Sequence, residues 1–264
     1  MKPDVKQSGD SSVTLLSFDT STATLAVAIV RNGVVMDSAV TLTERNHSVR
    51  IISEIKNLLI RNGLQASDLD AISVGQGPGS YTGVRIAVTV AKTLAWTWNK
   101  PLIGVSSLEA LAFGAWKALK QNDEDMAIDR DTWIIPLMDA RRGQVYTSRY
   151  AAGYPDKWDT IDQDGIRLIA DWSLRMEEKA TLENQVAAIW FVGEIAPHKA
   201  TIEQAEQSGA RLRTYAYEMD AGAVGLLAEL KYRQGQQNDV HSFVPNYTQL
   251  AEAEAKLLAA SRGE

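Results

Sequence analysis

Val13–Leu42 reads VTLLSFDTSTATLAVAIVRNGVVMDSAVTL, and this stretch decides the fold of the chain. Apolar residues dominate 13–17 and 24–30, and a third run with many β-branched residues spans 33–42. The dipeptide Asn32-Gly33 lies at the second junction, and Asn-Gly favours the two-residue turn that joins antiparallel strands. We therefore predict three antiparallel strands with a tight hairpin between the second and the third.

A helix is expected after the three strands. Apolar residues recur at helical spacing at Ile51, Ile52, Ile55, Leu58 and Leu59. Gly63 follows them, and glycine commonly ends a helix because it adopts the left-handed conformation without a steric penalty.

Two further strand–helix units follow along the chain. A short apolar strand at 71–75 leads through a glycine-rich loop into a helix that runs to about Trp98. A strand at 102–105 then precedes Ser106, a residue type that caps helix N-termini. This order predicts a mixed sheet covered by helices, an α/β lobe at residues 13–108.

A second lobe is expected beyond a polar run at 120–130. Strands are predicted at 133–138, 144–150 and 187–193, with helices near Ile202 and Val224. We place this lobe at 109–235 and a tail with a C-terminal helix at 236–264, and we expect that helix to join the first lobe. Residues 1–12 are polar and are predicted to be a disordered leader.

Composition limits the classes of function. The chain has 264 residues, a formal net charge of -6 and no cysteine, which excludes disulfides, cysteine nucleophiles and thiolate metal sites. The negative charge argues against a protein that holds nucleic acid by itself, so contact with tRNA is expected only through a complex. The absence of a membrane segment and of a signal sequence predicts a cytoplasmic protein without a membrane partner.

The glycine loop is the most distinctive motif. It reads GQGPGSYTGVR at 75–85 and contains, in its centre, Gly77, Pro78, Gly79, Ser80, Tyr81, Thr82 and Gly83. A loop between a strand and a helix exposes backbone N–H groups that can bind phosphate, but the spacing matches neither common phosphate-binding pattern, and no lysine follows the last glycine. The alternative is a tight turn in which Ser80 or Thr82 caps the helix.

The helix after this loop carries a stripe of small residues. Gly83, Ala87, Ala91 and Ala95 recur at every fourth position and so share one face. Small residues let a second helix approach closely. We predict that this stripe is the interface with a partner protein, and internal packing within the lobe is the alternative.

Three blocks resemble the signature blocks of the TsaB family, also called YeaZ. They are LLSFDTST at 15–22, GPGSYTGVRIAVTVAKTLA at 77–95 and DARRGQVY at 139–146. The resemblance implies an actin-like, sugar-kinase-like fold with two ribonuclease-H-like lobes. It also implies a role in tRNA threonylcarbamoyladenosine modification of ANN-decoding tRNAs.

In this family the transfer is made by the paralogous TsaD, and TsaE completes the assembly. The resemblance therefore implies a non-catalytic scaffold that forms a heterodimer with TsaD, with the contact on helices of the first lobe. This contact with TsaD would give the small-residue stripe its function. A homodimer through the same stripe is also expected to be possible.

An active ATP-binding kinase or hydrolase of the same fold is the main alternative. Such enzymes grip phosphate in each lobe through an acidic residue and a glycine turn, whereas here Asp19, Thr20 and Ser21 occupy the first turn without glycine. In the second lobe Asp139 is followed by Ala140, Arg141 and Arg142 before Gly143. We interpret both as degenerate phosphate loops and predict no nucleotide cofactor.

A metallopeptidase and a stand-alone binding protein are the two other classes of function. A metallopeptidase is disfavoured because the three histidines, His47, His198 and His241, show no short metal-binding spacing. TsaD-like enzymes bear a histidine pair on the first helix, and here Ile51 lies four residues after His47. We assign no catalytic residue and no metal ligand. A stand-alone homodimeric binding protein remains the third hypothesis.

Overall fold

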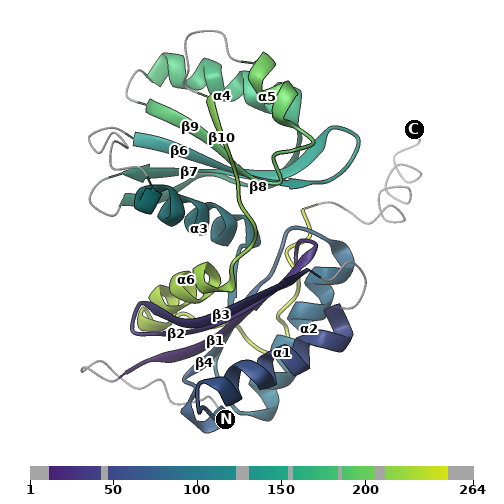
Figure 1. The fold of residues 1–264 in the computed structure, drawn as a ribbon, viewed down its shortest axis with the longest axis vertical. Helices are drawn as coiled ribbons and strands as arrows, with labels where there is room; N and C mark the ends of the chain where they lie inside the picture. Colours follow the sequence, from purple (N-terminus) through teal and green to yellow (C-terminus); the bar gives the residue numbers. More distant parts are fainter. Residues whose placement is uncertain are drawn as a thin grey trace.

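The computed structural model describes residues 12–42, 47–122, 131–153, 157–183, 186–205 and 212–248, and it consists of two lobes, each built on a five-stranded sheet (Figure 1). The strands of the first sheet are β1 Thr14–Asp19, β2 Thr24–Arg31, β3 Val34–Leu42, β4 Ala71–Gly75 and β5 Leu102–Val105. Those of the second are β6 Asp131–Asp139, β7 Gln144–Gly153, β8 Lys157–Leu168, β9 Val186–Gly193 and β10 Leu212–Ala216. Between and after the strands lie α1 His47–Arg61, α2 Tyr81–Thr97, α3 Ser107–Asn122, α4 Ile169–Glu183, α5 Lys199–Gln204 and α6 Ala221–Arg233, with a short 3-10 turn at Ala66–Asp68.

The two sheets have the same topology. Their orders are β3-β2-β1-β4-β5 and β8-β7-β6-β9-β10, with the first three strands of each antiparallel and the last two added in parallel. This confirms the predicted α/β, actin-like two-lobed fold with mixed sheets flanked by helices. The sequence shows no corresponding repeat, since the same topology is built from different residues in each lobe.

Local signals in the first lobe are confirmed. Asn32 and Gly33 have φ values of 50° and 74°, as the tight hairpin between β2 and β3 requires. Gly63, just beyond α1, has φ 62° and donates its N–H to the carbonyl of Ile60. Ser106 caps α3 by accepting the N–H of Glu109 at 3.1 Å.

Helices cover both faces of the first sheet. α1 and α2 pack on one face, where Phe18, Val27 and Ile72 are buried against them. α6 packs on the other face, where Gly225 approaches so closely that a side chain would meet Val30 and Ser17. The second lobe was predicted to extend to residue 235, and this is wrong for α6, because its apolar residues are buried on the first sheet.

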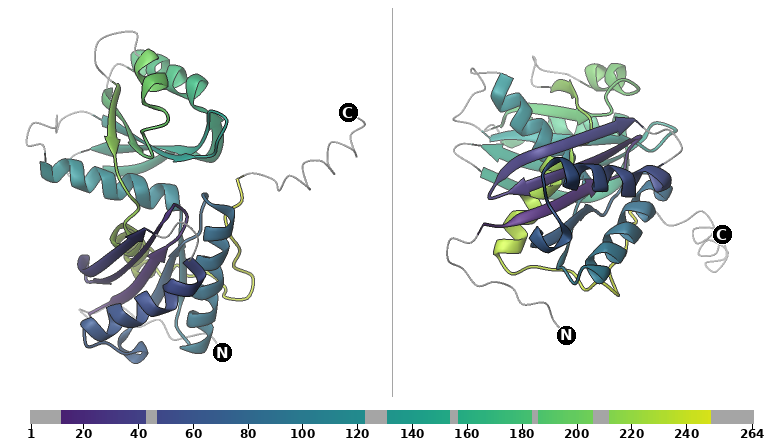
Figure 2. Two further views of the ribbon diagram at one scale, coloured as in Figure 1. Left: turned by 45° about the vertical axis from the view of Figure 1, so that its right-hand side comes forward. Right: turned by 60° about the horizontal axis from the view of Figure 1, so that its bottom comes forward.

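Residues 237–248 continue along the first lobe. The N–H of Asn238 donates to Leu102, its side-chain oxygen accepts from Gly104, and Phe243 is buried in the α1/α2 core. Figure 2 shows this yellow segment beside α2. The predicted leader at 1–12, apart from Ser12, and the predicted C-terminal helix beyond residue 248 lie outside the described residues. Among the helices that the structure describes, none is long and apolar enough to cross a membrane.

Candidate functional site

Asp19 ends β1 in the centre of the first lobe and is fully buried. One carboxylate oxygen accepts the backbone N–H and the hydroxyl of Ser21, both at 2.6 Å, and the other accepts the hydroxyl of Ser107 at 2.6 Å. Charge-assisted hydrogen bonds of this kind stabilise an ionised carboxylate away from water. Asp19 therefore ties the β1–β2 turn to the start of α3.

The glycine loop packs directly on this turn. A Cβ at Gly75 would lie 1.7 Å from a carboxylate oxygen of Asp19, and one at Gly83 would lie 1.9 Å from the carbonyl oxygen of Thr20. A Cβ at Gly79, which has φ 153°, would lie 2.4 Å from the carbonyl oxygen of Ser21. These glycines are required because two backbone segments meet here without room for a side chain.

Hydrogen bonds hold the two segments together. The N–H of Ser80 donates to the carbonyl of Ser21 at 2.7 Å, and the hydroxyl of Thr20 donates to the carbonyl of Gly83 at 2.7 Å. The side chain of Ser80 caps α2 by accepting the N–H of Gly83, which confirms one of the two predicted caps. The glycine loop and the first degenerate phosphate loop thus form one interlocked unit.

The small-residue stripe does not lie on the surface. Gly83, Ala87, Ala91 and Ala95 are all buried, and the three alanines belong to the core that α2 forms with the first sheet. The prediction that these four residues form a partner interface is wrong, because the chain itself covers them. Their small size lets α2 approach the sheet and the β1–β2 turn closely, so the internal alternative holds.

The opposite face of α2 is exposed. Tyr81 and Trp96 are 55% and 69% exposed, and Thr89 lies between them on the same side. Ile86 and Val90 line a shallow pocket of about 360 Å³ there.

The neighbouring helix α1 exposes apolar residues in the same direction, since both helices cover the same face of the sheet. Val49, Ile52 and Ile60 are between 51% and 75% exposed. We call the exposed residues of both helices, together with the half-buried Ile86 and Val90, the outer helix face: Val49, Ile52, Ile60, Tyr81, Ile86, Thr89, Val90 and Trp96. Apolar exposure of this extent is typical of a protein contact surface.

The second degenerate phosphate loop forms the β6–β7 hairpin. Asp139 ends β6, and its carboxylate lies 3.1 Å from the Nε2 atom of buried His198 and accepts the N–H of Arg141 at 3.2 Å. Arg141, Arg142 and Gly143 have φ values of 67°, 54° and 73°. The turn therefore keeps a left-handed backbone that favours glycine, although arginines occupy two of its three positions.

Glu194 closes this part of the second lobe. Its carboxylate accepts the N–H of Asp139 at 2.6 Å, and burial raises its pKa above the ordinary value for glutamate, with the Asp139 charge adding to the rise and His198 opposing it. The preceding Gly193 has φ 106° and packs against the carbonyl of Leu137. Gly193 and Glu194 thus both contact the rest of their own lobe.

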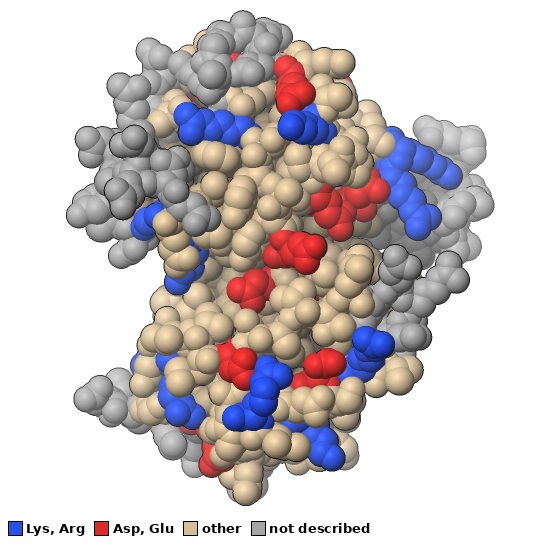
Figure 3. Space-filling view, viewed as in Figure 1, with Lys and Arg blue, Asp and Glu red and all other residues tan. Residues whose placement is uncertain are grey.

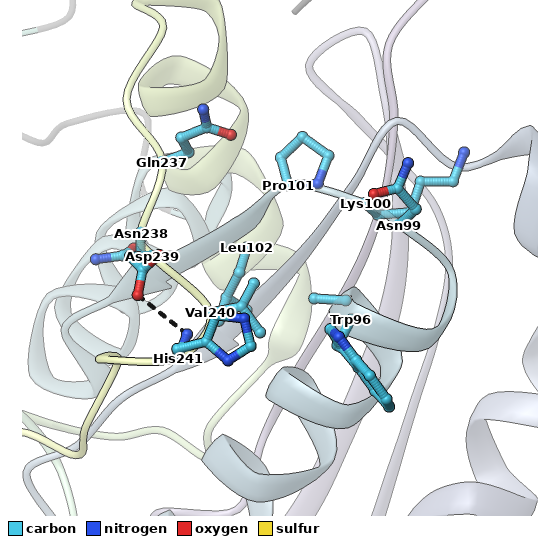
Figure 4. A pocket seen from close by; sticks show the side chains of 11 residues that line it. Trp96, Asn99, Lys100, Pro101, Leu102, Gln237, Asn238, Asp239, Val240 and His241 are labelled. Atoms are coloured by element: carbon cyan, nitrogen blue, oxygen red, sulfur yellow. Dashed lines mark hydrogen bonds between the residues drawn. The ribbon is translucent and has the colours of Figure 1, made fainter. Parts of the chain in front are cut away.

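A further concavity of about 580 Å³ lies in the first lobe, between the end of α2 and residues 237–241 (Figure 4). Its polar groups are engaged locally: Asn238 accepts from Gly104, and Asp239 accepts the N–H groups of His241 and Ser242. Trp96 stands at its edge. The described residues that line this concavity include no cluster of groups suited to catalysis.

No group of three potential metal ligands occurs in the described ranges. His47 begins α1, and its side chain lies outside the described residues.

Sequence reasoning missed the partners of both acidic residues. Ser107 holds Asp19 from a distant strand–helix junction, and His198 faces Asp139 across 59 positions. No local pattern marks either residue, because each contact depends on how the sheet edges are arranged.

Comparison with known proteins agrees with this geometry. The family model of TsaD, described as tRNA N6-adenosine threonylcarbamoyltransferase, matches residues 39–257. The "tRNA threonylcarbamoyladenosine biosynthesis protein TsaB" of Bacillus subtilis is 36% identical over 95% of this chain and 100% of its own length. Its counterpart in Escherichia coli is 35% identical over 58% of this chain and 61% of its own length.

A solved structure shares the fold. YeaZ from Pseudomonas aeruginosa superposes with a TM-score of 0.70 at 24% identity, covering 89% of this chain and 99% of its own. Because the TsaB protein of Bacillus subtilis is 36% identical to this chain and is matched over its full length, this protein belongs to the TsaB family.

Proposed function

We propose that this chain is a non-catalytic scaffold in tRNA threonylcarbamoyladenosine modification of ANN-decoding tRNAs. In this proposal it acts in the cytoplasm, binds a TsaD-type threonylcarbamoyltransferase as a heterodimer and supports it together with TsaE. The names of the relatives supply the pathway, and the geometry supplies the argument for a scaffold.

The observation that carries the proposal is the interlocked unit in the first lobe. Asp19 is fully buried with its carboxylate held by Ser21 and Ser107, and the glycine loop fills the space in front of it. An acid that orients a metal ion or a phosphate must face the ligand. This arrangement favours a structural role for both motifs.

The proposed contact with TsaD is the outer helix face. It presents apolar side chains of α1 and α2, and a homologous partner with a similar pair of helices would cover them by helix packing. This replaces the small-residue stripe as the proposed interface while keeping the same two helices.

Reconstitution tests the scaffold role. Purified TsaD and TsaE are combined with tRNA, substrates and a TsaC-type enzyme, which in this family makes the threonylcarbamoyl-adenylate donor. Modified adenosine is then measured with and without this chain. We expect modification to depend on the chain. Equal yields without it would overturn the proposal.

Two variants test the interface. Thr89→Arg and Ile52→Asp each place a charge on the outer helix face, and we expect co-purification with TsaD to be lost while the thermal unfolding temperature stays close to wild type. Leu182→Asp is the matched control, because Leu182 is 84% exposed on α4 of the other lobe. Normal co-purification of both variants would place the contact elsewhere.

The same face suits a second copy of the chain, which is the alternative of a homodimeric binding protein. Sedimentation of the chain at several concentrations, alone and with TsaD, distinguishes a heterodimer with TsaD from a homodimer. A homodimer that persists in the presence of excess TsaD would favour the homodimeric binding protein. Calorimetry with near-millimolar ATP tests the kinase or hydrolase alternative. We expect no binding heat at about 1 mM nucleotide.

A further inference from the structure

The chain after α6 runs antiparallel to α2 along the first lobe, and we call its residues 244–248 the strap. In the left view of Figure 2 this part of the chain follows α2 toward the second lobe. Phe243 anchors the start of the strap, because its side chain is buried in the core under α2 and its carbonyl accepts the Nζ of Lys92 at 2.9 Å. Beyond this anchor Val244 and Tyr247 are exposed, so the strap buries little apolar surface of its own and costs little to release.

The strap touches the second lobe through Asn246. The Nδ2 of Asn246 donates to a carboxylate oxygen of Asp164 in β8 at 3.0 Å. The same oxygen accepts the hydroxyl of Ser106 at 2.7 Å, and the other oxygen accepts the hydroxyl of Tyr150 at 3.3 Å. Burial raises the pKa of Asp164, and these three donors oppose the rise. We call the side chains of Asn246, Asp164 and Ser106 the clasp.

A β-bulge carries the acid of the clasp. The register between β7 and β8 shifts here, so that two residues of β8, Gln163 and Asp164, lie opposite the single residue Ser148. Bulges of this kind turn a side chain out of the regular alternation of a strand. The carboxylate of Asp164 therefore meets the first lobe, although β8 itself pairs within the second sheet.

The described chain passes between the lobes twice, at the β5–α3 junction and at 217–220 between β10 and α6. Lobes that are joined in this way can rotate about the line through their connections, as hinged domains do. Ser106 lies at the first connection, so its bond to Asp164 restrains this rotation little. Asn246 belongs to neither connection, and its bond gives the lobes a further point of attachment.

The strap also contacts the glycine loop and the outer helix face. The N–H of Asn246 donates to the carbonyl of Gln76 at 2.7 Å. The ring of Tyr247 lies 5.6 Å from the ring of Tyr81, which belongs to the outer helix face. Two adjacent residues thus contact the second lobe and the outer helix face. Because successive Cα atoms are about 3.8 Å apart, a movement of one of these residues displaces the other.

We propose that the strap couples the outer helix face to the angle between the lobes. With the strap docked, Tyr247 lies on Tyr81 and Asn246 holds Asp164, so a partner that covers both tyrosine rings stabilises this arrangement of the lobes. With the strap released, the outer helix face lacks Tyr247 and the lobes lose the bond from Asn246. That the partner is a TsaD-type protein rests on the proposed function, whereas the coupling within the chain does not.

Distances between spin labels on the two lobes test the coupling in the purified full chain. The chain has no cysteine, so Ser67→Cys and Glu178→Cys supply one labelling site in each lobe. Both residues are exposed, and neither belongs to the strap, the clasp or the outer helix face. Pulsed electron paramagnetic resonance then gives the distribution of distances between the lobes.

Asn246→Asp is the main variant. It removes the donor of the clasp and places a second carboxylate against Asp164, in a part of the molecule where the face drawn in Figure 3 already carries Asp and Glu side chains between the lobes. Because like charges repel, we expect a broader distribution that extends to longer distances. The double variant Asn246→Asp/Asp164→Asn exchanges the two groups. We expect it to restore the wild-type distribution, since an amide again faces a carboxylate.

Tyr81→Ala tests the other end of the strap. It removes the ring beside Tyr247 and leaves the clasp unchanged, so we expect a smaller broadening in the same direction. Ile52→Ala is the control, because Ile52 is exposed on the same face but belongs to α1, whereas the strap follows α2. We expect this control to keep the wild-type distribution.

Binding of TsaD gives the reciprocal measurement. We expect Asn246→Asp to bind TsaD about fivefold or more weakly, because coupling between two events acts in both directions. Excess TsaD is expected to narrow the distance distribution of this variant toward that of the wild type. The double variant is expected to regain the affinity.

Two results would overturn the proposal. An unchanged distribution in Asn246→Asp would show that the clasp does not restrain the lobes. An unchanged distribution in Tyr81→Ala would show that the outer helix face is not coupled to them. Failure of the proposed function gives a different result, since the distances measured without TsaD would still change in both variants while TsaD fails to bind the wild type.

Discussion

The two lobes place an acidic residue at the same position of the same topology and surround it differently. Asp19 ends β1 and is fully buried under the glycine loop, whereas Asp139 ends β6 with 34% of its side chain exposed and lies next to His198. In the first lobe three glycines bring a second backbone segment onto the turn, and in the second lobe arginines occupy the turn itself.

This difference shows two ways in which one architecture departs from a glycine-lined phosphate turn. The first lobe fills the space with its own backbone, and the residues involved become part of the core. The second lobe keeps an open hairpin and pairs its acid with a neighbouring side chain. Substitutions at matched positions are therefore expected to have unequal effects.

The largest effect is expected from Ala91→Arg in the first lobe. A guanidinium in place of a fully buried methyl group must displace α2 from the sheet or lose its hydration, at a cost of about 5 kcal/mol or more. We expect little soluble, folded protein by circular dichroism. Thr89→Arg on the exposed side of the same helix is the control, and a folded Ala91→Arg chain would mean that the stripe is less tightly packed than described.

Gly75→Ala is expected to rank next. Its methyl group would lie 1.7 Å from a carboxylate oxygen of Asp19, and we expect a loss of about 3 kcal/mol in the free energy of unfolding. Gly143→Ala, in the β6–β7 turn of the second lobe, is the comparison: φ is 73° there but no atom lies within 4 Å, and a loss of about 1 kcal/mol is expected. Equal losses in urea unfolding would remove the contrast between the lobes.

Asp19→Ala and Asp139→Ala compare the two acids directly. The first change leaves the donors of Ser21 and Ser107 buried without their acceptor, so we expect a loss of about 2 to 3 kcal/mol. The second removes a partly exposed pair with His198, and about 1 kcal/mol is expected. Urea unfolding of both variants measures the difference in the free energy of unfolding. A larger loss for Asp139→Ala would contradict the conclusion that the Asp19 carboxylate contributes more to stability.

The smallest effect concerns the pH dependence of the second lobe. Burial raises the pKa of Glu194, so the folded chain binds this proton more tightly than the unfolded chain does. The free energy of unfolding therefore falls as the pH rises from the pKa that Glu194 has in the unfolded chain to the higher pKa that it has in the folded chain. Glu194→Gln lacks this loss, and we expect its stability relative to wild type to increase over that pH range, which begins near the ordinary glutamate pKa of about 4. A constant difference in unfolding temperature across that range would contradict the cause given for the shift.

Much of the first lobe follows from local sequence. The Asn32-Gly33 hairpin, the end of α1 at Gly63 and the caps at Ser80 and Ser106 each depend on neighbouring residues and were predicted correctly. The position of α6 was not, because nothing near 221–233 indicates which of two sheets its apolar face will meet. Strand β8 was also missed, since it alternates exposed and half-buried polar residues instead of showing an apolar run.

In the candidate site, too, local features were predictable from the sequence and tertiary contacts were not. Glycines at Gly75, Gly79 and Gly83 were recognised as special, but whether they make room for a ligand or for Ser21 and Thr20 depends on the packed structure. Likewise, helical spacing placed Ala87, Ala91 and Ala95 on one face and could not indicate whether that face pointed inward.

The placement of α6 affects how the chain folds during synthesis. The second sheet is complete once β10 has emerged from the ribosome, whereas one face of the first sheet stays uncovered until 221–233 follow. The second lobe can thus fold before the first lobe is complete, and apolar residues of β1, β2 and β4 remain exposed during that time. Nascent chains truncated before residue 221 are expected to recruit chaperones that bind such surfaces, and chains extended past Phe243 to release them.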